Sequence, residues 1–195
     1  LLSSGMSDWV ELDTAVEVLS TSELTIMQCS SSYPCSYSDV GLNVLAEMRE
    51  RYGIPVGFSD HTETNYAAFA AVSQGAVCIE KHLTFSKAMY GSDAPLAAEP
   101  EQFRDLVAGI RAITAINASV VDKSDSASYT DMKQIFQKSI VARRDIAAGE
   151  ILSVDTLAYK KPGNGLSAAR YKEVIGKKAK SAINQDDFIQ LTDIK

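Results

Sequence analysis

The part of the chain that decides the fold runs from residue 56 to residue 84 and reads VGFSDHTETNYAAFAAVSQGAVCIEKHLT. A short apolar run at 56–59 predicts a buried strand. An alanine-rich segment at 65–73 then predicts a helix, with Gly75 as its C-terminal cap. A second apolar run at 76–80 predicts the next strand. Because a helix joins the two strands, the stretch is typical of a βα unit in a parallel sheet.

The same alternation extends on both sides of this stretch. A short apolar run, Leu1-Leu2, opens the chain, and Asp8 or Ser7 stands with Glu11 in the pattern of a capping box for the helix that follows. The other expected elements are a strand at 24–29, a helix at about 39–52 and a helix that starts near Pro100. Four βα units over residues 1–118 predict the C-terminal half of a (β/α)₈ TIM barrel, with the N-terminal half missing. An open doubly wound sheet is the alternative.

The pattern changes after this α/β part. Residues 119–137 are rich in serine, aspartate and alanine and show no apolar period, so we expect a linker there. Residues 138–195 contain short apolar runs separated by tight turns, including the glycine turn at 147–149 and the loop at 160–165. This pattern predicts a small, separate, β-rich domain.

Composition and charge exclude some classes of function. The chain has 195 residues, of which 46% are hydrophobic, and such a chain can bury a real core. Its net charge of -6 argues against a broad nucleic-acid surface, and no apolar run has the length of a membrane span. We therefore expect neither nucleic acid nor a membrane as a partner. The three cysteines suit neither a disulfide framework nor a zinc ribbon, and no targeting signal is visible, which favours a cytoplasmic location.

The chain contains only two histidines, His61 and His82, and each follows an expected strand directly. The active site of an α/β barrel lies at the carboxyl ends of its strands. The spacing between the histidines matches one helix plus one strand, so both rings are expected on adjacent strands, within reach of one cation. Asp60 and Glu80 are candidates to orient the rings or bind the metal. Structural hydrogen bonding by the histidines, and surface or capping roles for the carboxylates, are the alternatives.

Hydroxyl and amino groups gather at the same strand ends. Ser3, Ser31 and Ser59 are candidates for binding phosphate or carboxylate oxygens, and Lys81 and Lys87 offer positive charge for an anion. Such residues are also common in loops without a function. The sequence contains no Walker-type loop, no GxGxxG after a strand, no GxSxG elbow and no CxxC pair. Nucleotide-binding and hydrolase-triad functions therefore have no support.

Four motifs occur together: Gly-Phe-Ser-Asp-His-Thr at 57–62, Ile-Glu-Lys-His-Leu-Thr at 79–84, Gly-Ser-Asp at 91–93 and Lys-Lys-Pro-Gly-Asn-Gly at 160–165. In this order they resemble the sialic acid synthase family, which includes N-acetylneuraminate synthases and spore-coat polysaccharide enzymes. The resemblance implies a TIM barrel followed by a small SAF domain, also called antifreeze-like or β-clip. The expected domains are then the half-barrel at 1–118, the linker at 119–137 and the SAF domain at 138–195.

The resemblance also implies an activity. It is the condensation of phosphoenolpyruvate with an N-acylated amino sugar, similar to N-acetylmannosamine, to give a nonulosonic (sialic) acid and phosphate. The implied catalytic residues are His61, His82 and Asp93, although the pattern around Asp93 alone indicates no more than a turn. The two histidines are implied to ligate a divalent metal, Mn²⁺ or Mg²⁺, which acts as a Lewis acid on the sugar aldehyde.

The remaining implied roles concern the substrates. The residues expected to bind them are Ser3, Ser31, Tyr33, Ser59, Asp93 and Lys161. The three serines match positions for phosphoenolpyruvate, and Tyr33 and Asp93 match positions near the sugar. Lys161 matches an arginine that in many family members reaches across a dimer to the N-acyl group, but lysine lacks the planar fork of arginine. The sugar therefore stays open, and a domain-swapped homodimer is the implied assembly.

Two other functions are compatible with the same residues. One is another metal-dependent 3-deoxy-sugar-acid synthase that uses the same metal chemistry, which the SAF-like tail disfavours. The other is a noncatalytic carbohydrate-binding or assembly module, in which the C-terminal domain supplies the binding surface. The presence of His61, His82 and Asp93 favours a synthase over such a module.

Overall fold

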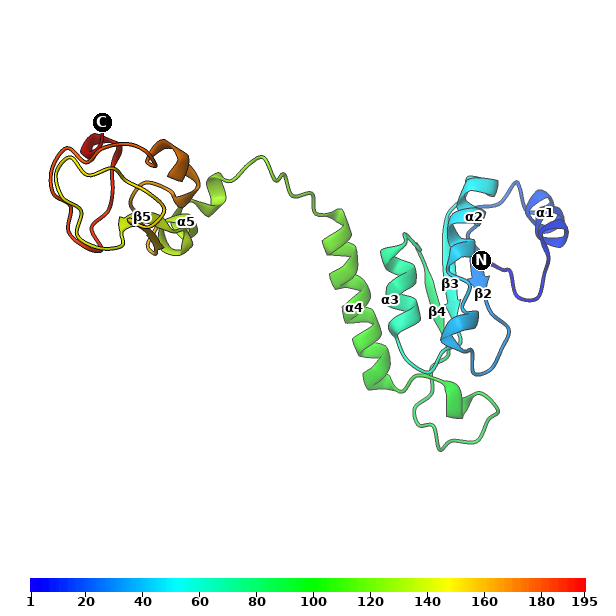
Figure 1. Cartoon of the computed structure of the whole chain (residues 1–195). Coiled ribbons are helices and arrows are strands. Elements are labelled where there is room, and N and C mark those ends of the chain that lie inside the picture. Colours follow the sequence, from blue (N-terminus) through cyan, green and yellow to red (C-terminus); the bar gives the residue numbers. More distant parts are fainter. The chain divides into compact units, whose positions relative to one another are not determined.

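The computed structural model describes all 195 residues. The chain divides into two compact units, Leu1–Val120 and Val121–Lys195 (Figure 1). Each unit has its own cluster of buried apolar side chains, so each has a core that does not depend on the other. No helix in either unit combines the length and the apolar character that crossing a bilayer requires.

A four-stranded sheet forms the centre of the first unit, with the strand order β1-β2-β3-β4. The strands are β1 (Leu2–Ser3), β2 (Ile26–Cys29), β3 (Val56–Asp60) and β4 (Ile79–Lys81). All three neighbouring pairs are parallel, which confirms the predicted α/β class with a parallel sheet. Every residue of the two central strands is buried, as is typical of parallel strands that are covered on both faces.

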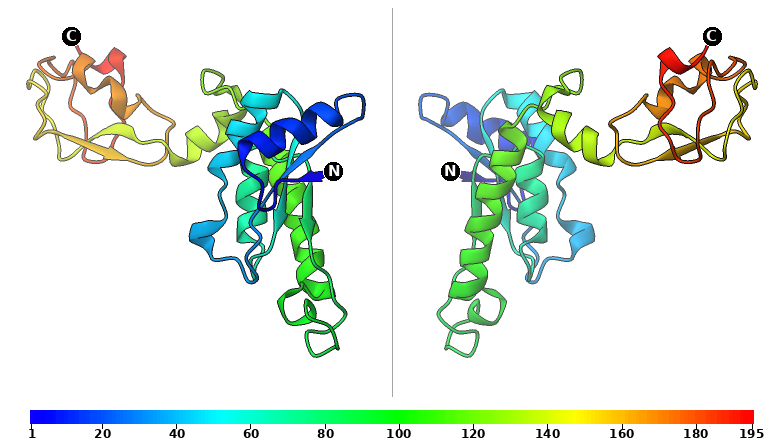
Figure 2. Two further views of the ribbon diagram at one scale, coloured as in Figure 1. Left: turned by 90° about the vertical axis from the view of Figure 1, so that its right-hand side faces the viewer. Right: turned by 90° about the vertical axis from the view of Figure 1, so that its left-hand side faces the viewer.

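The first unit has four α-helices: α1 (Trp9–Val18), α2 (Asn43–Tyr52), α3 (Tyr66–Ser73) and α4 (Pro100–Ala118). Helices α3 and α4 pack against each other and lie side by side in Figures 1 and 2. The predicted capping box at the start of α1 is confirmed, because the Asp8 carboxylate accepts from the backbone N–H of Glu11 and the Glu11 carboxylate accepts from that of Asp8. Gly75, with φ of +90°, ends α3 in the left-handed conformation, as predicted.

Three element starts in this unit differ from the sequence-based prediction. Strand β2 begins at Ile26 rather than at residue 24. Helix α2 begins at Asn43 rather than near residue 39, because Gly41 adopts φ of +68° and separates the helix from a 3₁₀ turn at Tyr37–Asp39. Strand β4 begins at Ile79 rather than at residue 76. Its pairing starts earlier, since the backbone N–H of Val77 donates to the carbonyl of Val56 over 2.9 Å.

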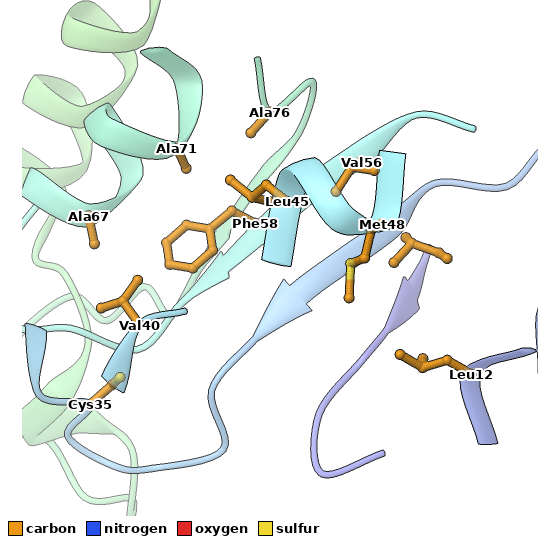
Figure 3. Packing of buried hydrophobic residues seen from close by; sticks show 11 residues of the cluster. Leu12, Cys35, Val40, Leu45, Met48, Val56, Phe58, Ala67, Ala71 and Ala76 are labelled. Carbon is orange, nitrogen blue, oxygen red and sulfur yellow. The ribbon is translucent and has the colours of Figure 1, made fainter. Parts of the chain in front are cut away.

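Apolar side chains from the sheet and the helices form one core in the first unit (Figure 3). Phe58 of β3 is 1% exposed, and Leu45 of α2 is fully buried. Figure 3 shows the Phe58 ring pointing toward Val40 and Ala67, the latter on α3. The sheet is therefore held to its helices directly behind the segment in which β3 ends, and that segment carries the candidate site.

The second unit contains one antiparallel pair, β5 (Ser139–Ala142) and β6 (Leu157–Lys160). Its other pairings are isolated bridges, such as Val141 with Phe188 and Ile151 with Lys178. The predicted β-rich domain therefore contains one regular strand pair and several single bridges. Its strands are shorter than the apolar runs in the sequence suggest.

The expected linker at 119–137 contains secondary structure. Helix α5 (Thr130–Phe136) lies within it and packs in the second unit, where the backbone N–H of Gly163 donates to the carbonyl of Gln134 over 2.7 Å. The sequence of this helix shows no apolar period, because its large apolar side chains are exposed to solvent: Ile135 is 56% and Phe136 is 55% exposed.

Candidate metal and substrate site

The candidate site is built on the register between β3 and β4. Ser59 lies opposite Glu80, and Asp60 lies opposite Lys81. Successive side chains of a strand point to opposite faces, so the first pair shares one face and the second pair shares the other. The two histidines come next in sequence and continue the alternation. The carboxyl ends of two adjacent strands thus carry two cross-strand pairs, and a histidine follows each strand directly.

The rings of His61 and His82 face each other, with centroids 5.3 Å apart and planes inclined by 47°. The expectation that they follow adjacent strands is confirmed. Tyr33, in the loop after β2, lies beside both rings, with centroid distances of 4.2 Å to His61 and 6.0 Å to His82. Loops that follow three consecutive strands therefore bring three aromatic rings into one group.

The hydrogen bonds of His61 determine its neutral tautomer. Its Nδ1 atom lies 2.8 Å from the carbonyl oxygen of Ser30, and its Nε2 atom lies 3.2 Å from the hydroxyl of Tyr33. A carbonyl oxygen only accepts, so Nδ1 carries the hydrogen and Nε2 presents a lone pair. Imidazoles that ligate metals are oriented in this way, by a backbone carbonyl on the other ring nitrogen. Sequence reasoning missed the Ser30 carbonyl, for which the only signal is its position directly after β2.

Tyr33 is the hydrogen-bond donor to this lone pair. Loss of solvent around its phenol raises the pKa of Tyr33, and the nearby Cys29, Asp93 and Glu80 raise it further. The hydroxyl therefore stays protonated at neutral pH and donates to Nε2 of His61. The Sγ atom of Cys29 also lies close to His61, 3.8 Å from Nδ1, and is a neighbour that sequence reasoning did not single out.

His82 lies at a more open part of the site, with 40% of its side chain exposed. Its Nδ1 atom is 3.8 Å from the Asp93 carboxylate, which is too far for a hydrogen bond but close enough for electrostatic attraction to a protonated ring. Both residues line a cavity of about 290 Å³ together with Tyr90 and Thr84. The structure therefore brings Asp93 to His82, although its own carboxylate is 64% exposed.

The predicted serines are not equally close to this group. Ser59 is buried, and its hydroxyl donates to the Glu80 carboxylate over 2.7 Å. Ser31 is exposed after β2, with its Oγ atom 3.7 Å from the position that a Cβ atom would take at Gly5. Ser3 is exposed on β1, two strands away from β3. Ser59 therefore lies on β3, two residues before His61 and bonded to Glu80, whereas Ser3 lies at the end of β1 and Ser31 follows β2.

Lys81 is not available to an anion in solvent, unlike the expectation from sequence. Its side chain is 2% exposed, and its ammonium group lies 2.8 Å from the Asp60 carboxylate, which is fully buried. Asp60 was a candidate to orient a histidine ring or to bind the metal. Its carboxylate is instead bonded to Lys81 and to the backbone N–H of Thr62. This pair lies on the strand face opposite Ser59 and Glu80.

Lys161 lies in the second unit, in the loop after β6. Its ammonium group stands 5.0 Å from the centre of the Phe136 ring, a cation–π contact with α5. The loop approaches α5 closely: a Cβ atom at Gly163 would come within 2.5 Å of the Lys133 carbonyl oxygen, so only glycine fits there. The loop is held further by the Ser139 hydroxyl, which donates to the Pro162 carbonyl over 2.7 Å.

The histidine pair fits a divalent cation as two of its ligands. A ring that binds through one nitrogen has its centroid about 3 Å from the ion, because a metal–nitrogen bond is about 2 Å long. The observed centroid separation of 5.3 Å therefore allows both rings to reach one ion. No group of three or more histidine, cysteine, aspartate or glutamate side chains is arranged to hold a metal. Two imidazoles alone would not fill the coordination sphere of a divalent ion.

The parallel sheet, the histidine pair at its strand ends and the separate β unit define a two-domain α/β protein with a candidate metal site. The chain belongs to the NeuB family, whose profile matches residues 1–122. The profile of the SAF domain matches residues 137–195. The two matches leave only a short segment between them, within the expected linker.

Similar proteins support this assignment. The chain is 34% identical to the N,N'-diacetyllegionaminic acid synthase of Campylobacter jejuni, over 97% of this chain and 58% of that protein. It is 39% identical to an uncharacterised protein of Methanocaldococcus jannaschii, over 100% of this chain and 58% of that one. The solved N-acetylneuraminic acid synthetase of Leptospira borgpetersenii is similar with a TM-score of 0.60 and 31% identity, over 67% of this chain and 46% of that one. The chain thus spans less than two thirds of these relatives.

Proposed function

We propose that the protein to which this chain belongs is a nonulosonic acid synthase. It condenses phosphoenolpyruvate with an N-acylated amino sugar, similar to N-acetylmannosamine, and releases phosphate. The observation that carries the proposal is the pair of facing imidazoles at adjacent strand ends, where the Nε2 lone pair of His61 accepts only the exchangeable hydroxyl of Tyr33. Membership of the NeuB family and similarity to the N,N'-diacetyllegionaminic acid synthase of Campylobacter jejuni support it.

In this proposal His61 and His82 hold a Mn²⁺ or Mg²⁺ ion, which when bound supplies Lewis-acid polarisation of the sugar aldehyde. His61 is fixed for this role through the Ser30 carbonyl, and His82 is accompanied by the Asp93 carboxylate. Asp93 and Tyr33 bind hydroxyls of the sugar. The open cavity beside His82 supports this, because it offers space at the exposed side of the pair.

Phosphoenolpyruvate is bound in this proposal by the hydroxyls of Ser3, Ser31 and Ser59. Ser59 is the best supported of the three, since it lies on β3 two residues before His61 and its hydroxyl is bonded to Glu80. A serine hydroxyl has one donor hydrogen, so Ser59 must turn from Glu80 toward the substrate to donate to a carboxylate or phosphate oxygen.

The fold belongs to the proposal as well. The parallel sheet has two edges, β1 and β4, and each exposes an unpaired row of backbone groups to further strands. Closure into a (β/α)₈ barrel removes such edges. Such a barrel is built from successive parallel βα units, and its active site lies at the carboxyl ends of the strands. We assign residues 1–118, within the first unit, to the C-terminal half of a TIM barrel, and residues 138–195, within the second unit, to an antifreeze-like SAF fold.

The activity is tested by phosphate release from phosphoenolpyruvate with the complete protein. Release is expected only when N-acetylmannosamine, or a related N-acyl amino sugar, and Mn²⁺ are both present. His61→Ala and His82→Ala should each abolish it, whereas Glu63→Gln, a change of an exposed carboxylate in the next turn, should not. Release without a divalent ion, or undiminished release by His61→Ala, would sink the proposed mechanism.

The homodimer is proposed together with the activity, with Lys161 serving the sugar site of a partner subunit. Coexpression of a His61→Ala chain with a Lys161→Ala chain tests this arrangement. If Lys161 acts on the other subunit, mixed dimers contain one intact site of two, and about a quarter of the wild-type activity returns. If Lys161 acts within its own chain, no mixed dimer has an intact site and no activity returns.

A further inference from the structure

The residues directly before the two histidines form a buried ion pair. Lys81 and Asp60 have side chains that are 2% and 0% exposed, and their charged groups lie 2.8 Å apart. The three donors of the Lys81 ammonium are all used: besides Asp60, they bond the carbonyl oxygens of Thr62 at 2.7 Å and Thr64 at 2.9 Å. Asp60, Lys81 and these two carbonyls are called the clamp below.

The clamp encloses His61 from both sides. Asp60 precedes His61 and accepts from the backbone N–H of Thr62 over 2.9 Å, which closes a turn around the histidine. Lys81 bonds the residue before His61, through the Asp60 carboxylate, and the residue after it, through the Thr62 carbonyl. Lys81 itself immediately precedes His82. The residues on both sides of His61 are therefore bonded to the side chain of the residue that directly precedes His82.

A purely stabilising role does not account well for such a pair. Removing two charges from water costs about as much as their attraction returns, and apolar replacements of a buried pair are often neutral or better. Apolar side chains at these two buried positions would avoid that cost. What the clamp does provide is a fixed geometry: it limits how far the loop at 61–64 moves relative to the end of β4.

We propose that Asp60 and Lys81 are positioning residues that set the separation of the His61 and His82 rings and thereby the affinity of the site for a divalent cation. This inference rests on the proposed function, in which the two rings share one ion. The clamp touches neither substrate nor ion, and it acts through the backbone of the histidines. Its loss therefore weakens metal binding without removing a ligand.

The test compares the removal of a buried ion pair with the removal of an exposed one in the complete protein. Lys81→Met leaves the Asp60 charge buried and risks misfolding, so the deciding variant is the double change Asp60→Asn with Lys81→Met. That variant removes both charges and keeps an oxygen for the N–H of Thr62. The matched control is Asp13→Asn with Arg51→Met, a pair in the same unit with side chains 43% and 45% exposed. Mn²⁺ affinity is measured by calorimetry, and folding by thermal unfolding.

A second measurement does not depend on the metal. In the ion-free protein with ¹⁵N-labelled histidine, the Nδ1–H of His61, bonded to the Ser30 carbonyl, gives an NMR signal that reports the ring position. We expect the folded double variant to bind Mn²⁺ about 10- to 100-fold more weakly and to broaden or lose this signal, while the control changes neither.

A folded double variant with wild-type Mn²⁺ affinity and an unchanged His61 signal would overturn the clamp. Absence of Mn²⁺ binding by the wild-type protein would instead refute the metal site of the proposed function. In that case the His61 signal alone decides whether the clamp positions the ring. The two failures are therefore distinguishable.

Discussion

The Nδ1 atom of His61 lies 2.8 Å from the carbonyl oxygen of Ser30. Because that oxygen has no hydrogen to give, the contact assigns the hydrogen to Nδ1 and the lone pair to Nε2. Tyr33 then meets Nε2 as a donor over 3.2 Å. One backbone carbonyl at the end of β2 thus prepares a ring at the end of β3 to act as a ligand.

This assignment predicts the tautomer of His61 in solution. Long-range ¹H–¹⁵N NMR of the histidine-labelled protein at pH above 7, without metal, should show a protonated Nδ1 and an unprotonated Nε2 for His61. The signal is identified by its loss in His61→Gln. A predominant Nε2–H form would contradict the hydrogen bonding to Ser30 and remove the main argument for His61 as a ligand.

Tyr33→Phe is expected to strengthen binding of the divalent ion in the absence of substrate. The hydroxyl of Tyr33 occupies the lone pair of His61, and this bond has to break before Nε2 binds an ion. A net hydrogen bond contributes about 1 kcal/mol, so the gain in affinity should be about fivefold. The same variant should raise the KM for the sugar, since Tyr33 is proposed to bind it. Calorimetry with Mn²⁺ measures the first effect, and weaker binding would contradict it.

Phe58→Ala is expected to destabilise the protein strongly. The Phe58 side chain is 1% exposed in the core behind β3, and removing such a ring costs about 3–5 kcal/mol. The matched control is Phe85→Ala, where the ring is 85% exposed and the change should stay within about 0.5 kcal/mol. Denaturant unfolding measures both. Similar losses in the two variants would show that the core lies elsewhere.

The Asp13–Arg51 pair gives a prediction about pH. The Arg51 guanidinium bonds the Asp13 carboxylate and lowers the pKa of Asp13 from 3.8 to about 2, against the opposing effect of burial. A folded-state pKa below the unfolded value stabilises the fold above that unfolded value, and this contribution disappears as the pH falls from about 4 through about 2. The Tm difference between wild type and Arg51→Gln should therefore be largest above pH 4 and shrink toward pH 2.

NMR titration provides the direct check of this pair. The pKa of Asp13 should rise toward 3.8 in Arg51→Gln, with a remaining reduction from the Tyr52 hydroxyl, which also donates to the Asp13 carboxylate. An Asp13 pKa near 3.8 in the wild-type protein would contradict the bonded pair seen between α1 and α2.

The sequence was sufficient to predict the elements around the site. The apolar run before Ser59 and the alternation with helices predict a parallel sheet, and the strand-end position of His61 and His82 predicts adjacent rings. These inferences succeed because they depend on local periodicity and on where a strand ends. The start of α2 was misplaced because the left-handed conformation of Gly41 is one of several that glycine adopts freely.

The side-chain partners in the site were less accessible from sequence. The Asp60–Lys81 pair depends on the register between β3 and β4, and a parallel register is set by a crossover connection rather than by a tight turn. The proximity of Asp93 to His82 depends on the course of a loop that has no periodicity. Helix α5 was missed because its apolar residues Ile135 and Phe136 are exposed, so that no amphipathic pattern marks it.

Calorimetric titration of the complete protein with Mn²⁺, alongside His61→Gln and His82→Gln, tests the central claim that one divalent ion is held by both histidines. We predict one binding site per chain in the wild-type protein and a large loss of Mn²⁺ affinity in each single variant, because neither ring replaces the other. Unchanged affinity in either variant would contradict it, since that histidine would then not be a ligand.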